Sequence, residues 1–232
     1  MLKRILVVED DRDISELIRY NLGRDGYDVS VVFDGVQAFD YASKIKPDLI
    51  VLDLMLPGQD GLDVCRQLKA DDDLKSIPVI MLTAKSEEAD VIVGLQMGAD
   101  DYITKPFSPK VLAARVKAIM RRFRKTEILS GLDHQRVYGH LTIDLLKRKV
   151  AYQDHPVALT ATEFDILEFL SRSPGRVYTR EQILDNVWKE GKFIIDRAVD
   201  VHVRGLRKKL GEGQCYIETV RSTGYRFKEG DI

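Results

Sequence analysis

The stretch LIVLDLMLPGQDG, residues 49–61, places one carboxylate, Asp53, directly after an apolar run that a parallel sheet would bury. Four further apolar runs have the length of strands: residues 4–8, 29–32, 78–82 and 101–104. Between these runs the apolar residues recur with helical period, for example from Ile14 to Leu22. The alternation predicts an α/β domain, a doubly wound five-stranded parallel sheet with helices on both faces.

Length and composition allow more than one domain. The chain has 232 residues, of which 44% are hydrophobic and 31% are charged. Its longest apolar runs are far shorter than the ~20 residues of a membrane span, and its start lacks the regions of a signal peptide. We therefore expect a cytoplasmic protein that has no membrane partner. Cys65 and Cys215 lie far apart with no further ligand pair, which favours neither a disulfide framework nor a zinc site.

The alternation of strand-like and helical segments ends near residue 123, where a charged segment follows. The segment RRFRKTEILSG contains a short charged linker, which we place at 124–130, between a first domain at 1–123 and a second at 131–230. The second domain begins with two brief strands about a turn, and CYIETVRSTGYRF near its end is typical of a hairpin. Three helical segments lie between them: 161–172, 179–188 and 196–210. This order predicts an α+β domain.

Polar residues follow four of the five expected strands of the first domain, at the carboxyl ends that meet at one edge of a parallel sheet. They are Glu9, Asp10 and Asp11 after the first strand, Asp53 after the third, Thr83 after the fourth and Lys105 after the fifth. Taken singly, such residues more often cap helices or start turns. Taken together, the carboxylates would repel one another unless a cation such as Mg²⁺ joined them.

A lysine and a hydroxyl beside such an ion are suited to neutralise and hydrogen-bond a phosphoryl group. The sequence has no GxxxxGK[ST] segment, so a nucleotide-binding P-loop is not indicated. A carboxylate then remains as the candidate nucleophile, because aspartyl phosphates are established covalent intermediates.

Four blocks resemble the receiver domain of bacterial two-component response regulators over about 120 residues: VVEDD, LIVLDLMLPGQDG, LTA at 82–84 and GADDYITKPF at 98–107. The resemblance implies a CheY-like sheet of order 2-1-3-4-5 and a phosphoryl group that a sensor histidine kinase transfers to Asp53. It also implies a site for Mg²⁺, or Mn²⁺, whose protein ligands would be Glu9, Asp10, Asp53 and the Met55 carbonyl. Thr83 and Lys105 would contact the phosphoryl group, and the bond before Pro106 would be cis.

The resemblance extends to a switch and a dimer. Tyr102 resembles the aromatic residue that moves with Thr83, although an ordinary strand tyrosine is the alternative. Phosphorylation would favour a homodimer through the fourth helix, fifth strand and fifth helix, with contacts from Val91, Asp100, Asp101, Val111, Arg115 and Lys117. Members of the OmpR/PhoB subfamily commonly carry opposite charges at the places of Val91 and Val111. The two valines predict an apolar contact and a dimer that is less sensitive to salt.

The segment DRAVDVHVRGLRKKL, residues 196–210, is amphipathic, with Arg197, Arg204 and Lys208 nearly opposite its apolar side. A basic stripe is often only solvated surface, but nine basic and four acidic residues within 192–228, together with the basic hairpin, favour a winged helix-turn-helix. LTATEFDILEFL, SRSPGRVYTREQIL, this helix and IETVRSTGYRF resemble the OmpR/PhoB effector domain. That resemblance implies contacts to double-stranded DNA from Arg197, Arg204, Arg207, Lys208 and Arg221, with His202 structural or at a phosphate. Gly205 stands where many members carry a second arginine, which leaves the base readout there open.

The sequence thus predicts a DNA-binding transcriptional response regulator that dimerises on tandem half-sites once Asp53 is phosphorylated, with RNA polymerase as a further partner. It would be no enzyme beyond its own phosphorylation from acyl phosphates and its own dephosphorylation. Two alternatives stay open. An aspartyl-phosphate phosphatase is disfavoured because the DxD spacing of such hydrolases is absent around Asp53. A regulator that acts without phosphorylation is the other.

Overall fold

Strands and helices alternate through residues 4–124 of the computed structural model, which describes residues 2–84, 88–124, 134–188 and 197–230 and only the backbone path of 88–91 and 122–124. The strands are β1 (Arg4–Val8), β2 (Asp28–Val32), β3 (Leu49–Asp53), β4 (Val79–Thr83) and β5 (Asp101–Thr104). The helices are α1 (Arg12–Arg24), α2 (Gly35–Ile45), α3 (Gly61–Ala70), α4 (Glu88–Gln96) and α5 (Pro109–Arg124).

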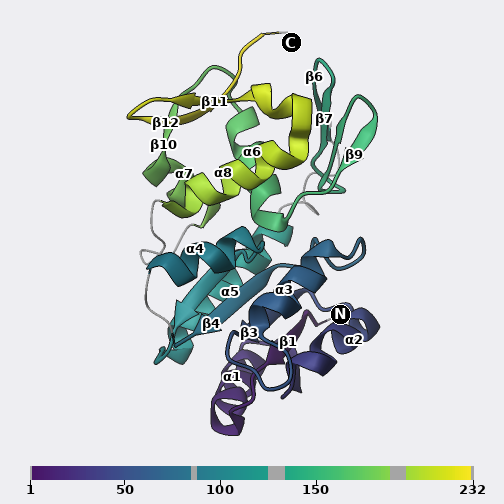
Figure 1. Cartoon of the computed structure of the whole chain (residues 1–232), viewed down its shortest axis with the longest axis vertical. Helices are drawn as coiled ribbons and strands as arrows, with labels where there is room; N and C mark the ends of the chain where they lie inside the picture. The colour runs from purple at the N-terminus through teal and green to yellow at the C-terminus, as the bar shows by residue number, and fades with distance from the viewer. Residues whose placement is uncertain (1, 85–87, 125–133, 189–196, 231–232) are drawn as a thin grey trace. The chain divides into compact units, whose positions relative to one another are not determined.

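All five strands are parallel and lie in the order β2-β1-β3-β4-β5, with helices on both faces (Figure 1), which confirms the predicted fold. The three inner strands are almost entirely buried, because apolar side chains alternate between the two covered faces. Registers of Val8 with Leu52 and of Asp53 with Leu82 bring the carboxyl ends of β1, β3 and β4 together. Asp11 caps α1 by accepting hydrogen bonds from two backbone amides, so it is a helix cap.

The remaining described residues form two antiparallel sheets and three α-helices. One sheet contains β6 (Gln135–Tyr138), β7 (Leu141–Asp144), β8 (Lys149–Tyr152) and β9 (His155–Val157). The other has the order β10-β12-β11 and consists of β10 (Tyr178–Thr179), β11 (Ile217–Val220) and β12 (Gly224–Phe227). The helices are α6 (Ala161–Ser171), α7 (Arg180–Val187) and α8 (Arg197–Leu210), and the 3-10 helix η2 (Gly211–Tyr216) follows. The two strands expected before the first helix are β7 and β8, and β6 and β9, which were not predicted, extend that hairpin on both sides.

Local signals position these helices as predicted. Thr160 and Glu163 form the expected capping box of α6, and Thr179 forms a second one with Gln182 at α7. Glu163 also contacts α8, where its carboxylate pairs with Lys209 at 2.7 Å. A Cβ atom at Gly205 would lie only 2.6 Å from Glu163 Oε1, so α8 approaches α6 closely at this glycine.

The chain divides into two compact units, Met1–Met120 and Arg121–Ile232. Residues 125–130 of the predicted linker lie outside the described residues, so the boundaries at 123 and 131 stay a prediction. Cys65 is buried and Cys215 exposed, and both are free thiols. Within the described ranges, the chain has no helix of the length and apolar character that a bilayer crossing requires.

Candidate functional sites

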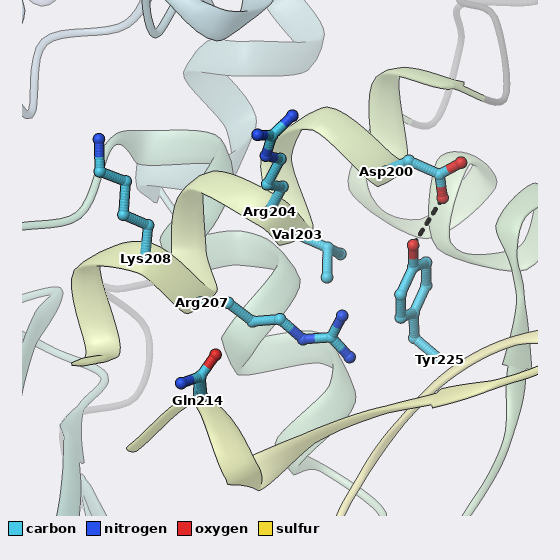
Figure 2. Close-up of a pocket in the computed structure, with 7 residues that line it drawn as sticks. All are labelled: Asp200, Val203, Arg204, Arg207, Lys208, Gln214 and Tyr225. Atoms are coloured by element: carbon cyan, nitrogen blue, oxygen red, sulfur yellow. Dashed lines mark hydrogen bonds between the residues drawn. The ribbon is translucent and has the colours of Figure 1, made fainter. Parts of the chain in front are cut away.

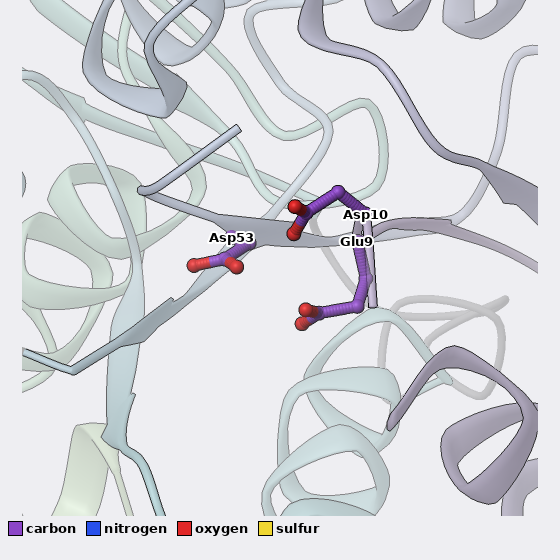
Figure 3. Close-up of side chains that lie close together, drawn as sticks. All are labelled: Glu9, Asp10 and Asp53. Carbon is purple, nitrogen blue, oxygen red and sulfur yellow. The ribbon is translucent and has the colours of Figure 1, made fainter. Parts of the chain in front are cut away.

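Three carboxylates meet at the carboxyl edge of the parallel sheet (Figure 3). One oxygen from each of Glu9, Asp10 and Asp53 lies within 4.8 Å of the others. Glu9 follows β1 and is fully buried, Asp53 ends β3 and is buried, and Asp10 is exposed. Glu9 Oε2 is buried and has no hydrogen-bond partner among the described residues. The cluster therefore combines two buried carboxylates with one that faces water. One buried oxygen of the cluster, Glu9 Oε2, is available to bind a cation.

Lys105 joins two of these carboxylates. Its Nζ lies 2.7 Å from Glu9 Oε1 and 2.8 Å from Asp53 Oδ2. The lysine is placed by the end of β5, where its amide donates to the Thr83 carbonyl at 2.7 Å, and the bond to Pro106 is cis, as the family resemblance implied. One cation thus serves two buried anions, so the site keeps a negative excess that a further cation could balance.

The protonation of this cluster follows from burial and charge. Burial raises the pKa of Glu9 to about 7, opposed by the Lys105 hydrogen bond and reinforced by the charge of Asp53. Burial lowers the pKa of Lys105, but its hydrogen bonds to Asp53 and Glu9 outweigh this and leave that pKa above the ordinary value. Lys105 is therefore a stable cation, whereas Glu9 can take up a proton near neutral pH.

A tight loop follows Asp53. The Met55 amide donates to Asp53 Oδ1 at 3.1 Å, while the Met55 side chain is exposed, as expected if only its backbone serves the site. The Gly61 amide closes the loop on the Leu54 carbonyl at 3.0 Å, and a Cβ atom at Gly61 would lie 2.1 Å from the Asp53 carbonyl oxygen. Only glycine fits there, so the backbone at Gly61 packs directly against the backbone of Asp53, the candidate nucleophile.

Thr83 and Tyr102 lie on the neighbouring strands β4 and β5. Thr83 is the buried last residue of β4 and lies in register with Thr104 of β5. Tyr102 is half-buried on β5 and packs against the apolar core beneath. The hydroxyl of Thr83 thus stands at the same sheet edge as Asp53, whereas a switch role for Tyr102 stays a prediction.

Three of the predicted dimer residues, Asp100, Asp101 and Arg115, are paired inside the chain. Asp100 is 1% exposed, accepts from the Val79 amide at 2.9 Å and pairs with Lys69 at 3.0 Å. Lys69 also donates to the carbonyls of Lys75 and Ile77 at 3.3 and 2.7 Å. In this conformation the Asp100 carboxylate therefore binds groups of its own domain.

Arg115 is likewise paired with Asp101 at 2.6 Å, while Lys117 is exposed and Val111 half-buried on α5. The Val91 side chain lies outside the described residues. The dimer contacts remain predictions, and those of Asp100, Asp101 and Arg115 would compete with these internal bonds.

The predicted DNA-contacting residues divide into two groups. Arg197, Arg204 and Lys208 are exposed along α8, and Arg221 is exposed between β11 and β12. His202 is 2% exposed and its ring lies 5.6 Å from that of Trp188, so it packs inside the domain. Arg207 is half-buried and hydrogen-bonded to β11.

A hollow of about 390 Å³ lies between α8, η2 and β12 (Figure 2). Its lining residues are Asp200, Val203, Arg204, Arg207, Lys208, Gln214 and Tyr225. Sequence reasoning missed Asp200 and Tyr225, which hydrogen-bond each other at 2.7 Å. Asp200 could have been noticed in the sequence, because it is an acidic residue in an otherwise basic helix. The hollow carries three cations and one paired carboxylate, a charge balance that favours an anion.

Known proteins match both parts of the chain. Residues 5–117 match the family described as "Response regulator receiver domain", and residues 154–227 match "Transcriptional regulatory protein, C terminal". The chain is 44% identical over 235 residues to the phosphate regulon transcriptional regulatory protein PhoB of Escherichia coli, covering 98% of each. It is 43% identical over 231 residues to the DNA-binding response regulator MtrA of Mycolicibacterium smegmatis, covering 97% of each. Among solved structures, a RitR mutant of 33% identity covers 98% of this chain and 100% of its own, with a TM-score of 0.79.

Proposed function

Since the chain belongs to the OmpR/PhoB family of two-component response regulators, we propose that a sensor histidine kinase phosphorylates Asp53 and thereby controls DNA binding. Its relatives are transcriptional regulators, and the chain is a DNA-binding two-component regulator. The observation that carries the proposal is the Lys105 ammonium, which lies between the buried carboxylates of Glu9 and Asp53. This arrangement sets a cation directly beside the carboxylate that would act as the nucleophile.

The carboxylates fit a hard divalent ion. Glu9, Asp10 and Asp53 offer oxygens within 4.8 Å of one another, and the buried Glu9 Oε2 has no hydrogen-bond partner within the described part of the chain. With the Met55 carbonyl they would hold Mg²⁺ or Mn²⁺. A bound ion would supply positive charge to the oxygens of the transferring phosphoryl group.

In the transfer, an Asp53 carboxylate oxygen forms a bond to phosphorus as the bond from phosphorus to the kinase imidazole nitrogen breaks, and the nitrogen keeps the electron pair. Lys105 then donates to a phosphoryl oxygen in place of the carboxylate. Thr83, at the end of the adjacent strand, donates its hydroxyl to another oxygen, and Tyr102 turns inward with it. The face of α4, β5 and α5 changes as a result.

Two receivers would form a dimer through that face. The contacts would come from six residues: Val91, Asp100, Asp101, Val111, Arg115 and Lys117. Dimerisation would place two effector domains on tandem DNA half-sites. Arg197, Arg204, Lys208 and Arg221 would contact DNA, because they are exposed cations of α8 and the hairpin, whereas the exposed Lys209 is paired with Glu163. RNA polymerase is the further partner that such a transcriptional regulator requires.

Beryllofluoride or acetyl phosphate with Mg²⁺ tests the proposal on the full chain. We expect an adduct that maps to Asp53 and tighter binding to duplexes selected from a random pool. Lack of an adduct, or unchanged DNA affinity in the modified protein, would favour the regulator that acts without phosphorylation. Release of phosphate over many turnovers from an added phosphorylated substrate would favour a phosphatase. Asp60→Asn is the matched control, because Asp60 is an exposed helix cap on the same loop and asparagine caps equally well.

A further inference from the structure

The hairpin of residues 217–227, called here the C-terminal hairpin, is joined to α8 through Arg207. Arg207 Nε and Nη2 donate to the Ile217 carbonyl at 3.1 and 2.7 Å, and Nη2 also donates to Thr219 Oγ1 at 2.9 Å. The carbonyl belongs to β11, an edge strand of its sheet. Edge strands carry backbone groups without a neighbouring strand, so the guanidinium supplies the donors that a further strand would.

A second connection joins the same two elements nearer the start of α8. Tyr225 of β12 donates its hydroxyl to Asp200 Oδ1 at 2.7 Å, and Arg180 Nε donates to the same oxygen at 2.8 Å. Burial, together with the hydrogen bond to Asp200, raises the pKa of Tyr225 to about 12, so its hydroxyl keeps the proton that it donates. Figure 2 shows the dashed contact between Tyr225 and Asp200 at one side of the hollow, with the Arg207 guanidinium directed toward Tyr225.

The Tyr225 ring is also flanked by guanidinium groups. Arg180 Cζ lies 5.3 Å and Arg207 Cζ 5.5 Å from the ring centroid, both within the range of cation–π attraction. The hairpin is thereby fixed to α8 at two points separated by two helical turns, Asp200 and Arg207. Two points define an orientation, whereas one would leave a hinge.

These bonds limit what Arg207 can do for DNA. A guanidinium reads guanine with two nitrogens in parallel, and Nε and both hydrogens of Nη2 are already committed within the chain. Only Nη1 remains, which cannot form that two-nitrogen contact alone. Arg204 and Lys208, by contrast, are exposed on the same helix.

We infer that Arg207 is a positioning residue, which sets the orientation of the C-terminal hairpin and of Arg221 relative to α8, and that Arg204 and Lys208 are left as the DNA-contacting cations of that helix segment. The inference replaces the direct DNA contact predicted for Arg207. It rests on the proposed DNA-binding function, because the orientation of the hairpin matters only if Arg221 contacts DNA.

Hydrogen exchange in the DNA-free full chain tests the inference directly. Arg207→Lys keeps the positive charge but loses the planar fork that bonds one carbonyl twice. We expect amides of residues 217–227 to exchange roughly tenfold faster, since a hydrogen bond from a charged donor is lost. Lys208→Ala, the exposed neighbour, should leave that exchange unchanged. Thr219→Val removes one acceptor from the other side and should speed the same amides to a smaller extent.

DNA binding supplies the second readout, measured with beryllofluoride and Mg²⁺ on a duplex that the wild-type protein selects from a random pool. Arg207→Lys should weaken binding roughly tenfold, and much less when Arg221→Ala is already present, because residues that act through one another are non-additive. Lys208→Ala should act additively with Arg221→Ala and lower the salt dependence by about one ion.

Unchanged exchange of residues 217–227 in Arg207→Lys would overturn the inference, whatever the DNA affinity. Additive losses for Arg207→Lys and Arg221→Ala would overturn it as well, since a direct contact behaves in that way. If Arg221→Ala and Lys208→Ala both leave DNA affinity unchanged while exchange responds to Arg207→Lys, the proposed DNA surface fails and the positioning contact stands.

Discussion

The carboxylate cluster and the cationic face of α8 hold their charges in opposite ways. Glu9 and Asp53 are buried and depend on Lys105, whereas Arg204 and Lys208 lie in water, where an unpaired charge is well solvated. Changes at the cluster should therefore alter its chemistry, the stability of the fold, or both. Changes at the exposed face should alter DNA binding and leave folding nearly unaffected.

Asp53→Asn should abolish covalent phosphorylation while the fold is retained. Asparagine matches the shape of aspartate and its carbonyl can still accept from Lys105, but it has no carboxylate nucleophile. Intact-protein mass spectrometry after treatment with acetyl phosphate and Mg²⁺ measures the incorporated phosphoryl group, and circular dichroism checks the fold. Full incorporation in this variant would place the acceptor elsewhere.

Lys105→Met should destabilise the metal-free protein by about 3 kcal/mol, because two buried carboxylates lose their shared cation. Urea unfolding measures the change, and added Mg²⁺ should restore part of the loss by binding the folded state. Lys117→Met on the exposed surface of α5 is the control and should change stability by less than about 0.5 kcal/mol. Equal stability of the two variants would mean that the cluster is not isolated from water.

The stability of the metal-free protein should depend on pH through Glu9. Its pKa is raised from 4.5 to about 7 on folding, so the folded state binds more protons between these values and the contribution of Glu9 is lost as pH rises through 7. The slope is at most about 1.4 kcal/mol per pH unit. Unfolding free energies between pH 5 and 8 measure it, and Glu9→Gln or saturating Mg²⁺ should flatten the curve. A wild-type curve parallel to that of Glu9→Gln would contradict the assignment.

Gly205→Ala should change the unfolding free energy by less than about 1 kcal/mol, because alanine favours the helix by about that amount while its Cβ meets Glu163 Oε1. The carboxylate end must then shift from Lys209. Gly23→Ala on α1 is the matched control, since no heavy atom lies within 4 Å of its Cβ, and it should stabilise by about 0.5–1 kcal/mol. Equal gains at both glycines would show that Glu163 does not fill the space beside Gly205.

The members of the carboxylate cluster follow from the sequence because topology gathers them. Once five apolar runs are assigned to one parallel sheet, Glu9, Asp53, Thr83 and Lys105 must come to the same edge, whatever their rotamers. The distances confirm this for the two carboxylates and the lysine. The capping box at Thr160 was equally predictable, since its two residues are three positions apart.

The role of Arg207 could not be predicted in this way. On a helical wheel Arg207 lies between the buried Val203 and the exposed Arg204, and its long side chain can point to water or to its own domain. The choice depends on the Ile217 carbonyl, which only the folded hairpin brings within reach. The internal pairing of Asp100 was missed for a related reason, since its partner Lys69 lies on α3, far away in the sequence. Long polar side chains with distant partners are where sequence reasoning stops.

The bonds of Lys69 have a chemical consequence. Acylating reagents attack a neutral, accessible amine, but Lys69 is 6% exposed at its side chain and donates to three oxygens. Its labelling rate would therefore report how often the amino-terminal edge of the sheet opens, far from the carboxylates. The exposed Lys44 on α2 provides the internal reference for reagent reactivity. Covalent modification of Lys69 would thus measure local opening of the receiver domain.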